Sequence, residues 1–433
     1  MALVVVVGDY SANFFTLFSV LQFSLTIFVI SILISAVLLS KRWSKSALPD
    51  VEKLSKDHLP KISLILPTWN EEKVIEAKLE DVENQQYPSH LLEVIIIDSA
   101  SSDSTIPIVR RWLSERGFGE GEKYRIIQEE SRQGKSYSIN RAFDEADVDS
   151  EILMMSDVDC RLAEGVLLMI ANRFNDESIG AVTGRQILLN LDQNRKSSEE
   201  GSYRDFFSMM RIAESRFSST PIFHGECSAY RREAISDHKL VENSNADDSQ
   251  MAVSAIRSGY RAIYDPEISF YEMAPPDGRA SKIQKVRRAQ GLVRHFWRNR
   301  DMIANGRFGN FRKVLALEFI LHIVLPITMV IGFIAGFCHI GLLINEFGLQ
   351  TNFVNDLSLV DKLMLATDLF VVLLLTSGLS GAPIPGGRLS FTFFNYMVTL
   401  FKAQILIMSG RSLHQWQQVS AVREILAEYD KNS

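Results

Sequence analysis

The chain has 433 residues, of which 46% are hydrophobic and 23% charged, and its formal net charge at pH 7 is −6. This composition excludes a disordered protein, a collagen-like repeat and a disulfide-stapled secreted fold, and the acidic balance argues against nucleic acid as the main partner. The three cysteines lie far apart without metal-ligand spacing, so they predict neither a disulfide framework nor a zinc site.

An uncharged apolar segment near the N-terminus predicts a membrane span. Residues 14–39 contain no charged residue and no proline, and they exceed the about 20 apolar residues that a helix needs to cross a bilayer. The basic residues Lys41, Arg42 and Lys45 follow this run, which favours a true span over a cleaved signal peptide. By the positive-inside rule, the same flank predicts that the middle of the chain is cytoplasmic.

Three further apolar stretches, residues 314–344, 363–379 and 389–408, are predicted spans in the C-terminal third. Ten basic residues against one acid in residues 282–313 again predict a cytoplasmic side before the first of them. The side on which the tail 411–433 lies stays open. Three crossings of the membrane would place the tail on the outer side. Its mixed-charge amphipathic pattern instead suits the cytoplasmic surface, in which case one C-terminal segment is interfacial or re-entrant.

The middle of the chain alternates between strand-like and helix-like patterns. Short runs rich in Ile, Val and Leu occupy residues 62–66, 92–97, 124–127 and 152–155, with a helical pattern over 71–84. This alternation predicts a parallel α/β sheet whose strands are buried on both faces. Ligands of such sheets bind beyond the carboxyl ends of the strands, so the polar residues after these runs are expected to converge on one cleft.

The strongest chemical signal is Asp157-Val158-Asp159, directly after an apolar strand. Alternation along an extended segment points both carboxylates to one side, where they can address one hard cation and its phosphate ligands. Alone the pattern is weak, because two aspartates two residues apart also occur in solvated turns.

A set of motifs in chain order is more specific. It comprises Pro67-Thr-Trp-Asn-Glu71, Asp98 to Thr105, Gly134-Lys135, Asp157-Val-Asp159, Gly225 to Arg231, Asp247-Asp248 and Gln284-Lys-Val-Arg287-Arg288. Over residues 61–300 the chain thereby resembles the membrane-bound, inverting glycosyltransferases of family two, which include dolichyl-phosphate sugar transferases, ceramide glucosyltransferase, and cellulose and hyaluronan synthases. The resemblance implies an α/β fold: a GT-A domain with a mixed, mostly parallel sheet, flanked by transmembrane helices.

The apolar segments and the resemblance together predict a division of the chain into five parts. Residues 1–45 form an N-terminal transmembrane helix and its basic flank, and 46–60 a linker. Residues 61–300 form the cytoplasmic GT-A domain, 301–410 an interfacial helix and the C-terminal transmembrane helices, and 411–433 an amphipathic tail.

The resemblance also implies the donor-site residues. Asp157 and Asp159 match a pair that binds the ribose and a divalent metal, Mg²⁺ or Mn²⁺, on the diphosphate. Arg287 matches an arginine that supplements the metal on the same phosphates, a role suited to a bidentate donor. The nucleotide-sugar-binding residues implied are Pro67, Asn70, Glu71, Asp98, Lys135, Asp157, Gln284 and Arg288.

Asp248 matches the family's general base, which takes a proton from the acceptor hydroxyl during a single, inverting displacement. The other interpretation of Asp248 is structural, because aspartate is favoured at the start of a helix. Asp248 can have both roles at once. If the acceptor is a lipid phosphate, Asp248 is expected mainly to position it. The acceptor-side residues implied are Gly225, Glu226 and Asp247.

Two residues near these motifs have a structural interpretation beside a functional one. His224 is expected either to face the acceptor or to be a hydrogen-bonded structural histidine. Cys160 is expected to be a small buried thiol, since no neighbour in the sequence indicates nucleophilic chemistry.

The function expected is transfer of a sugar from a UDP- or GDP-sugar to a polyisoprenyl phosphate or lipid-linked glycan, by a multi-pass membrane protein with a cytoplasmic catalytic domain. Ser99 replaces a second aspartate of the pattern, which leaves the nucleotide unassigned. A processive polysaccharide synthase is the alternative, although Arg288 stands where such synthases carry a tryptophan. A catalytically inactive membrane scaffold is the second alternative.

Overall fold

The computed structural model describes residues 2–119, 121, 123–190, 207–242, 244–274, 279–347, 357–382, 384–411 and 420–432. The chain forms two compact units, each discontinuous in sequence. One comprises Met1–Leu39 with Leu317–Ser409, and the other Ser40–Ala316 with Gly410–Ser433. The tail therefore belongs to the same unit as the predicted catalytic region.

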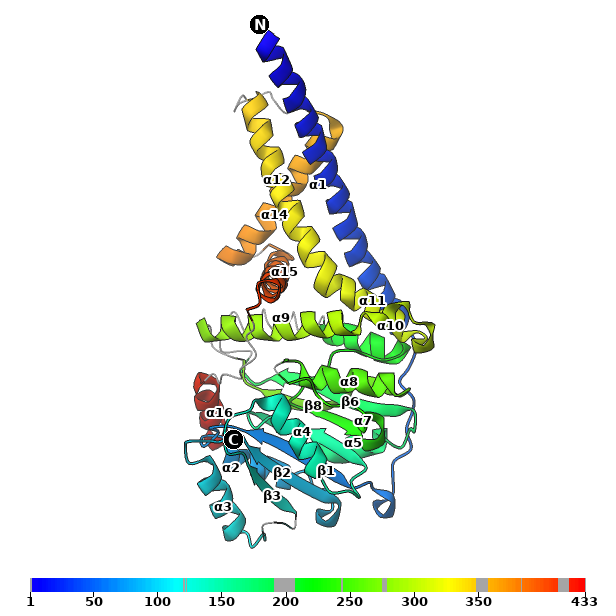
Figure 1. Ribbon diagram of the computed structural model, residues 1–433, viewed down its shortest axis with the longest axis vertical. Coiled ribbons are helices and arrows are strands. Elements are labelled where there is room, and N and C mark those ends of the chain that lie inside the picture. Colours follow the sequence, from blue (N-terminus) through cyan, green and yellow to red (C-terminus); the bar gives the residue numbers. More distant parts are fainter. Residues whose placement is uncertain are drawn as a thin grey trace. The chain divides into compact units, whose positions relative to one another are not determined.

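The second unit is built on an eight-stranded sheet with the order β3-β2-β1-β4-β7-β6-β8-β5 (Figure 1). The strands are β1 (Ile62–Thr68), β2 (Leu92–Asp98), β3 (Tyr124–Gln128), β4 (Ile152–Met155), β5 (Cys160–Leu162), β6 (Ile179–Leu188), β7 (Ser228–Arg231) and β8 (Arg261–Glu272). Neighbours pair in parallel from β3 to β4 and between β6 and β8. The pairs β4–β7, β6–β7 and β5–β8 are antiparallel, so the sheet is mixed, as expected.

The four apolar runs of the sequence form strands β1 to β4, and every residue of β1, β2 and β4 is buried. This burial needs helices on both faces of the sheet. The helices of this unit are α2 (Ile75–Glu83), α3 (Thr105–Glu115), α4 (Lys135–Glu145), α5 (Val166–Arg173), a helix over 207–217, α7 (Arg232–Ile235), α8 (Asp247–Arg257), α9 (Arg279–Asn299), α10 (Asp301–Ala304) and α16 (Ser420–Asn432).

Helix α2 begins at Ile75, later than the helical pattern from residue 71 predicts. The reason is a turn around Asn70, whose φ of 55° lies in the left-handed region. The Asn70 amide donates to Ser101 Oγ, and the Asn70 side-chain oxygen accepts from the Ser102 amide. The turn after β1 is thereby tied to the loop after β2.

The first unit is helical. Its elements are α1 (Ala2–Trp43) as far as Leu39, α11 (Phe311–Phe319) from Leu317 onward, a π-helical turn η4 (Ile320–Val324), α12 (Leu325–Phe347), α14 (Leu359–Ser380) and α15 (Gly387–Met408). Within the described residues, four helical segments are long and apolar enough to cross a membrane: Phe18–Trp43, Phe311–Asn345, Leu359–Ser380 and Gly387–Met408. They coincide with the four predicted spans.

Candidate active site

A cavity of about 510 Å³ opens beyond the carboxyl ends of the central strands. It gathers side chains from the turn after β4, the first turns of α4 and α8, the segment before β7, and α9. Ten of the residues implied by the resemblance line it: Lys135, Asp157, Asp159, Gly225, Glu226, Asp247, Asp248, Gln284, Arg287 and Arg288. Of the polar residues after the strands that were expected to converge on one cleft, Thr68–Glu71, Asp98–Asp103 and Asp157–Asp159, only Asp157 and Asp159 line this cavity.

Four implied nucleotide residues do not line this cavity: Pro67, Asn70, Glu71 and Asp98. Asp98 is 1% exposed, and its carboxylate accepts hydrogen bonds from the Ser101 amide and hydroxyl. Asp98 and Asn70 thus hold the loops beside the cavity, and their contact with a nucleotide stays a prediction.

Lys135 and Asp157 form an ion pair inside the cavity. Gly134, with φ of 102°, ends the loop before α4 and puts Lys135 at the start of that helix. The Lys135 Nζ lies 2.5 Å from Asp157 Oδ1. Burial raises the pKa of Asp157, but the Lys135 charge outweighs it and leaves this pKa below its usual value. Burial lowers the pKa of Lys135, yet the carboxylates of Asp157 and Asp247 raise it overall, so both groups stay charged.

Asp159 pairs instead with a residue that the sequence did not single out. Its Oδ2 lies 2.9 Å from Nη1 of Arg423, on helix α16, and Arg423 lines the same cavity. The two aspartates that follow β4 therefore each have a cationic partner, from different parts of the chain.

The two aspartates fit a hard divalent cation. Carboxylate oxygens are the ligands that Mg²⁺ and Mn²⁺ prefer. Among the described residues there is no group of three or more His, Cys, Asp or Glu that could hold a metal by itself. Asp157 and Asp159 can thus supply part of a coordination shell, whose other oxygens would come from a diphosphate and water.

Asp248 lies in the first turn of α8, as one interpretation expects, and it lines the cavity. Its role as the general base stays a prediction. Its Oδ1 accepts a hydrogen bond of 2.8 Å from the Ser249 amide. Burial and, to a smaller extent, the carboxylates of Glu226 and Asp247 raise the pKa of Asp248 to about 7, against the lowering effect of the Ser249 hydrogen bond. Asp248 is therefore a carboxylate that can take up and release a proton near neutral pH.

Gly225 separates Lys135 from Asp248. A Cβ at this position would lie 3.5 Å from Lys135 Nζ and 3.8 Å from Asp248 Oδ2. Any larger side chain would fill the space between the cation and the candidate base. The glycine thus keeps open the part of the cavity in which a reacting group would sit.

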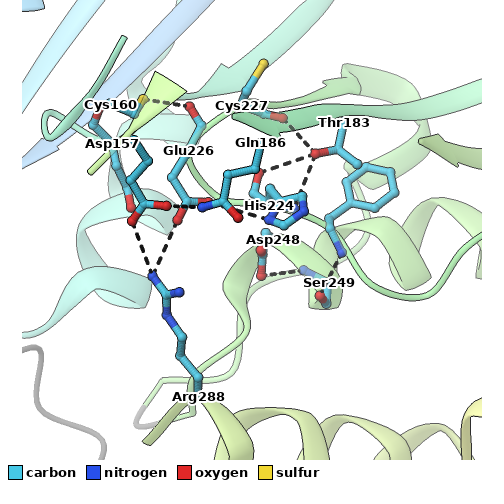
Figure 2. A network of polar contacts seen from close by, with 12 residues as sticks. Asp157, Cys160, Thr183, Gln186, His224, Glu226, Cys227, Asp248, Ser249 and Arg288 are labelled. Carbon is cyan, nitrogen blue, oxygen red and sulfur yellow. Dashed lines mark hydrogen bonds and ion pairs between the residues drawn. The ribbon is translucent and has the colours of Figure 1, made fainter. Parts of the chain in front are cut away.

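Helix α9 contributes the arginines. Gly291 on α9 lets this helix approach the loop before α8, because a Cβ there would lie 2.8 Å from Asn245 Cβ. Figure 2 shows Arg288 reaching toward Glu226, and its Nη2 lies 3.5 Å from Glu226 Oε1 and 3.9 Å from Glu272 Oε1. Burial and the neighbouring Arg288 charge lower the pKa of Arg287 to about 10, so Arg287 remains a cation at neutral pH.

His224 and Cys160 differ in their relation to the cavity. His224 lines it and shares a hydrogen bond with Arg211, which favours the interpretation as a hydrogen-bonded histidine at the cavity wall. Cys160 is completely buried, as expected. Burial raises the pKa of its thiol to about 12, so the reactive thiolate is not populated at neutral pH.

Comparisons with known proteins agree with this arrangement. The family model described as "Glycosyl transferase family group 2" matches residues 152–384, and that of "Glycosyl transferase family 2" matches residues 63–239.

Among curated proteins, the chain is 26% identical over 255 residues to a probable glycosyltransferase, YdaM, from Bacillus subtilis, with 54% of this chain and 55% of the relative covered. It is 26% identical over 280 residues to a beta-monoglucosyldiacylglycerol synthase from Trichormus variabilis, with 62% and 57% covered. The chain thus spans a little over half the length of these relatives.

Among solved structures, the chain is similar to the mannosyltransferase PcManGT from Pyrobaculum calidifontis, solved in complex with GDP-Man and Mn²⁺. The TM-score is 0.69 and the sequence identity 28%, with 91% of this chain and 100% of the other covered. The expected GT-A fold with its mixed sheet is confirmed by this likeness.

Proposed function

Because the chain belongs to glycosyl transferase family group 2, we propose that it moves one sugar, with inversion, from a nucleoside diphosphate sugar to a lipid-linked acceptor at a membrane. The observation that carries this proposal is the composition of the cavity. Two aspartates and several cations suit a diphosphate, and a separate carboxylate with a pKa of about 7 suits an acceptor hydroxyl.

The diphosphate end of the donor is bound, in this proposal, by Asp157, Asp159, Lys135 and Arg287. A divalent cation held by the two aspartates would stabilise the negative charge that the nucleoside diphosphate gains as it leaves. Lys135 and Arg287 donate charge-assisted hydrogen bonds to the phosphate oxygens, which strengthen as that charge develops. The PcManGT structure contains GDP-Man with Mn²⁺, which supports a cation-dependent nucleotide-sugar donor.

Asp248 acts as the general base in this proposal. Its carboxylate takes the proton from the acceptor hydroxyl while that oxygen forms a bond to the anomeric carbon and the bond to the diphosphate breaks. One displacement from the face opposite the leaving group inverts the configuration at the anomeric carbon. A pKa of about 7 suits the task, because the base is largely ionised just above neutral pH and still accepts a proton readily.

The acceptor side is proposed to lie at Gly225, Glu226 and Asp247, next to the base. A lipid-linked acceptor is supported by the four apolar helical segments and by a relative that is named as a monoglucosyldiacylglycerol synthase. Transfer of a single sugar is favoured because Arg288, paired with Glu226, occupies the position of the tryptophan in processive synthases.

In this proposal the N-terminal apolar segment and two of the three C-terminal ones cross the membrane, with the catalytic unit in the cytoplasm. Since Gly410–Ser433 belongs to the same unit as Ser40–Ala316, both lie on one side, and the residues between them cross an even number of times. Two of the three apolar segments in that stretch therefore cross fully. Helix α15, the least apolar of them, is the one that lies along the surface or re-enters.

Donor-dependent release of nucleoside diphosphate by the purified protein in detergent tests the proposal. UDP- and GDP-sugars are screened with Mn²⁺ or Mg²⁺, with and without a polyisoprenyl phosphate. Release that requires both cation and lipid, with a product of one sugar, supports the proposal. A long saccharide formed without lipid would establish the polysaccharide synthase instead, and failure to bind any nucleotide would favour the scaffold.

A further inference from the structure

Helix α16 is an integral part of the catalytic unit, although it follows the apolar helices in the chain. Its Val422 and Leu426 are 4% and 0% exposed and belong to the same hydrophobic cluster as residues of β1 and β2. Figure 1 shows α16 next to α2, and an ion pair of 2.8 Å joins Glu424 of α16 to Lys73, just before α2. The helix is therefore held by apolar burial, and its polar face meets the loop after β1.

Arg423 on this helix bridges two carboxylates. Its Nε and Nη2 lie 3.0 Å and 2.9 Å from the two oxygens of Glu71, and its Nη1 lies 2.9 Å from Asp159 Oδ2. The Arg423 side chain is 7% exposed and that of Glu71 is 0% exposed. One planar guanidinium thus uses all three of its nitrogens to join the loop after β1 to the turn after β4.

The bridge fixes the orientation of Asp159. Arg423 engages Oδ2 of Asp159 through its Nη1, at 2.9 Å. Without the guanidinium, the contact that joins Asp159 to the buried Glu71 would be lost. The Asp159 carboxylate would then be expected to lose its defined direction.

We propose that Arg423 is a positioning residue of the donor site, which holds Asp159 so that Oδ1 is presented to a divalent cation. This inference rests on the proposed function, because it concerns the same aspartate. It also gives Glu71 a role that the sequence resemblance did not: Glu71 anchors Arg423 from inside the protein. Arg423, which lies 264 positions after Asp159 in the chain, therefore completes the donor site.

In this proposal, Arg423 stays in the site when the cation binds and is not displaced by it. Swinging Arg423 out of the cavity would break its two hydrogen bonds with the buried Glu71 carboxylate and its ion pair with Asp159, which is unfavourable. It would also disturb helix α16, whose Val422 and Leu426 belong to the hydrophobic core. A cation would therefore bind beside Arg423 and would not replace it.

Binding of Mn²⁺ to the full-length protein in detergent, in the presence of GDP or UDP, tests this inference without turnover. Free Mn²⁺ is measured from its electron paramagnetic resonance signal, and a thermal unfolding curve for each variant verifies folding. Arg423→Gln is expected to weaken Mn²⁺ binding at least tenfold. Arg423→Lys is expected to lie between Arg423→Gln and the unchanged protein, because it keeps the charge but not the three-nitrogen fork.

The matched controls remove other ionic contacts of α16 and leave Asp159 untouched. Glu424→Gln loses the pair with Lys73, and Asp430→Asn loses the pair of 2.7 Å with Arg161. Both are expected to bind Mn²⁺ within twofold of the unchanged protein, since they perturb only the attachment of the helix.

Four results would overturn the inference. Mn²⁺ affinity within twofold of normal in folded Arg423→Gln would make Arg423 purely structural, and tighter binding would mean that it competes with the cation. An equal loss in Glu424→Gln would assign the effect to the attachment of α16. If Arg423→Gln does not fold, the Mn²⁺ affinity of Arg423→Lys is compared with that of the unchanged protein instead. Loss of Mn²⁺ binding in Asp159→Asn together with normal binding in both Arg423 variants would overturn this inference but keep the proposed function.

Discussion

Asp248 is the residue whose charge state the pH dependence of turnover will report. Only its ionised form can accept the proton of an acceptor hydroxyl, and its pKa is raised to about 7. The activity is therefore expected above this pH and lost as the pH falls through it. One pH unit below the pKa, about a tenth of the carboxyls is ionised, so kcat/KM should fall about tenfold at pH 6 and about 100-fold at pH 5.

The assay is release of nucleoside diphosphate between pH 5 and 9 at constant ionic strength, with an acceptor that carries a free hydroxyl. Asp248→Asn should lower kcat by about 10²–10⁴-fold, should remove the inflection near pH 7, and should still bind nucleotide. Glu226→Gln serves as the electrostatic control. Because the Glu226 carboxylate raises the pKa of Asp248, its removal should move the inflection to lower pH.

The reasoning would be refuted by a flat profile between pH 5 and 8 in the unchanged protein. It would equally be refuted if Asp248→Asn kept its activity within threefold, or if its residual activity showed the same inflection. In either case another group would accept the proton, and Asp248 would be left with its role in the first turn of α8.

Three further predictions concern the donor site and α16. Asp157→Asn and Asp159→Asn should each abolish measurable cation-dependent release of nucleoside diphosphate, and full activity of either with Mn²⁺ would refute the donor-site assignment. Arg287→Ala should lower kcat by about 10²–10³-fold with a smaller effect on KM, measured by steady-state kinetics, because its charge acts mainly on the leaving diphosphate. Leu426→Ala should destabilise the catalytic unit by about 2–5 kcal/mol in a denaturation experiment, and an unchanged unfolding midpoint would contradict the burial of this residue.

Local sequence patterns predicted the elements whose causes are local. The four apolar runs are strands β1 to β4, since continuous Ile, Val and Leu residues are stable only where both faces of a sheet are covered. The Asp157-Val-Asp159 turn follows β4 and lines the cavity, as the position of polar residues after parallel strands indicates. The helix around Asp247 and Asp248 was also indicated, because aspartate is favoured in a first turn.

Features that depend on distant contacts could not be predicted in this way. The pairing of Arg423 with Glu71 joins residues 352 positions apart, and nothing near either residue indicates the other. The amphipathic pattern of the tail, residues 411–433, indicated a helix. It did not indicate which part of the protein this helix packs against. Glu272, at the end of β8, lines the cavity because of the strand order, which apolar runs alone do not specify.

The start of α2 shows how one residue changes a helical pattern. The apolar spacing from residue 71 onward fits a helix, yet Asn70 adopts a left-handed conformation and its side chain binds the neighbouring loop. Asparagine tolerates this conformation better than most residues, and its amide competes with helical hydrogen bonds. The helix therefore begins only at Ile75.

The discontinuity of the catalytic unit has a consequence for how the protein is made. Ser40–Ala316 is synthesised before Leu317–Ser409, and α16 follows only after those apolar helices have been translated. Until then the nascent chain carries Glu71 and Asp159 without their shared guanidinium. If Arg423 positions Asp159 as proposed, the donor site would thus reach its full affinity for a divalent cation only after the apolar helices have been made.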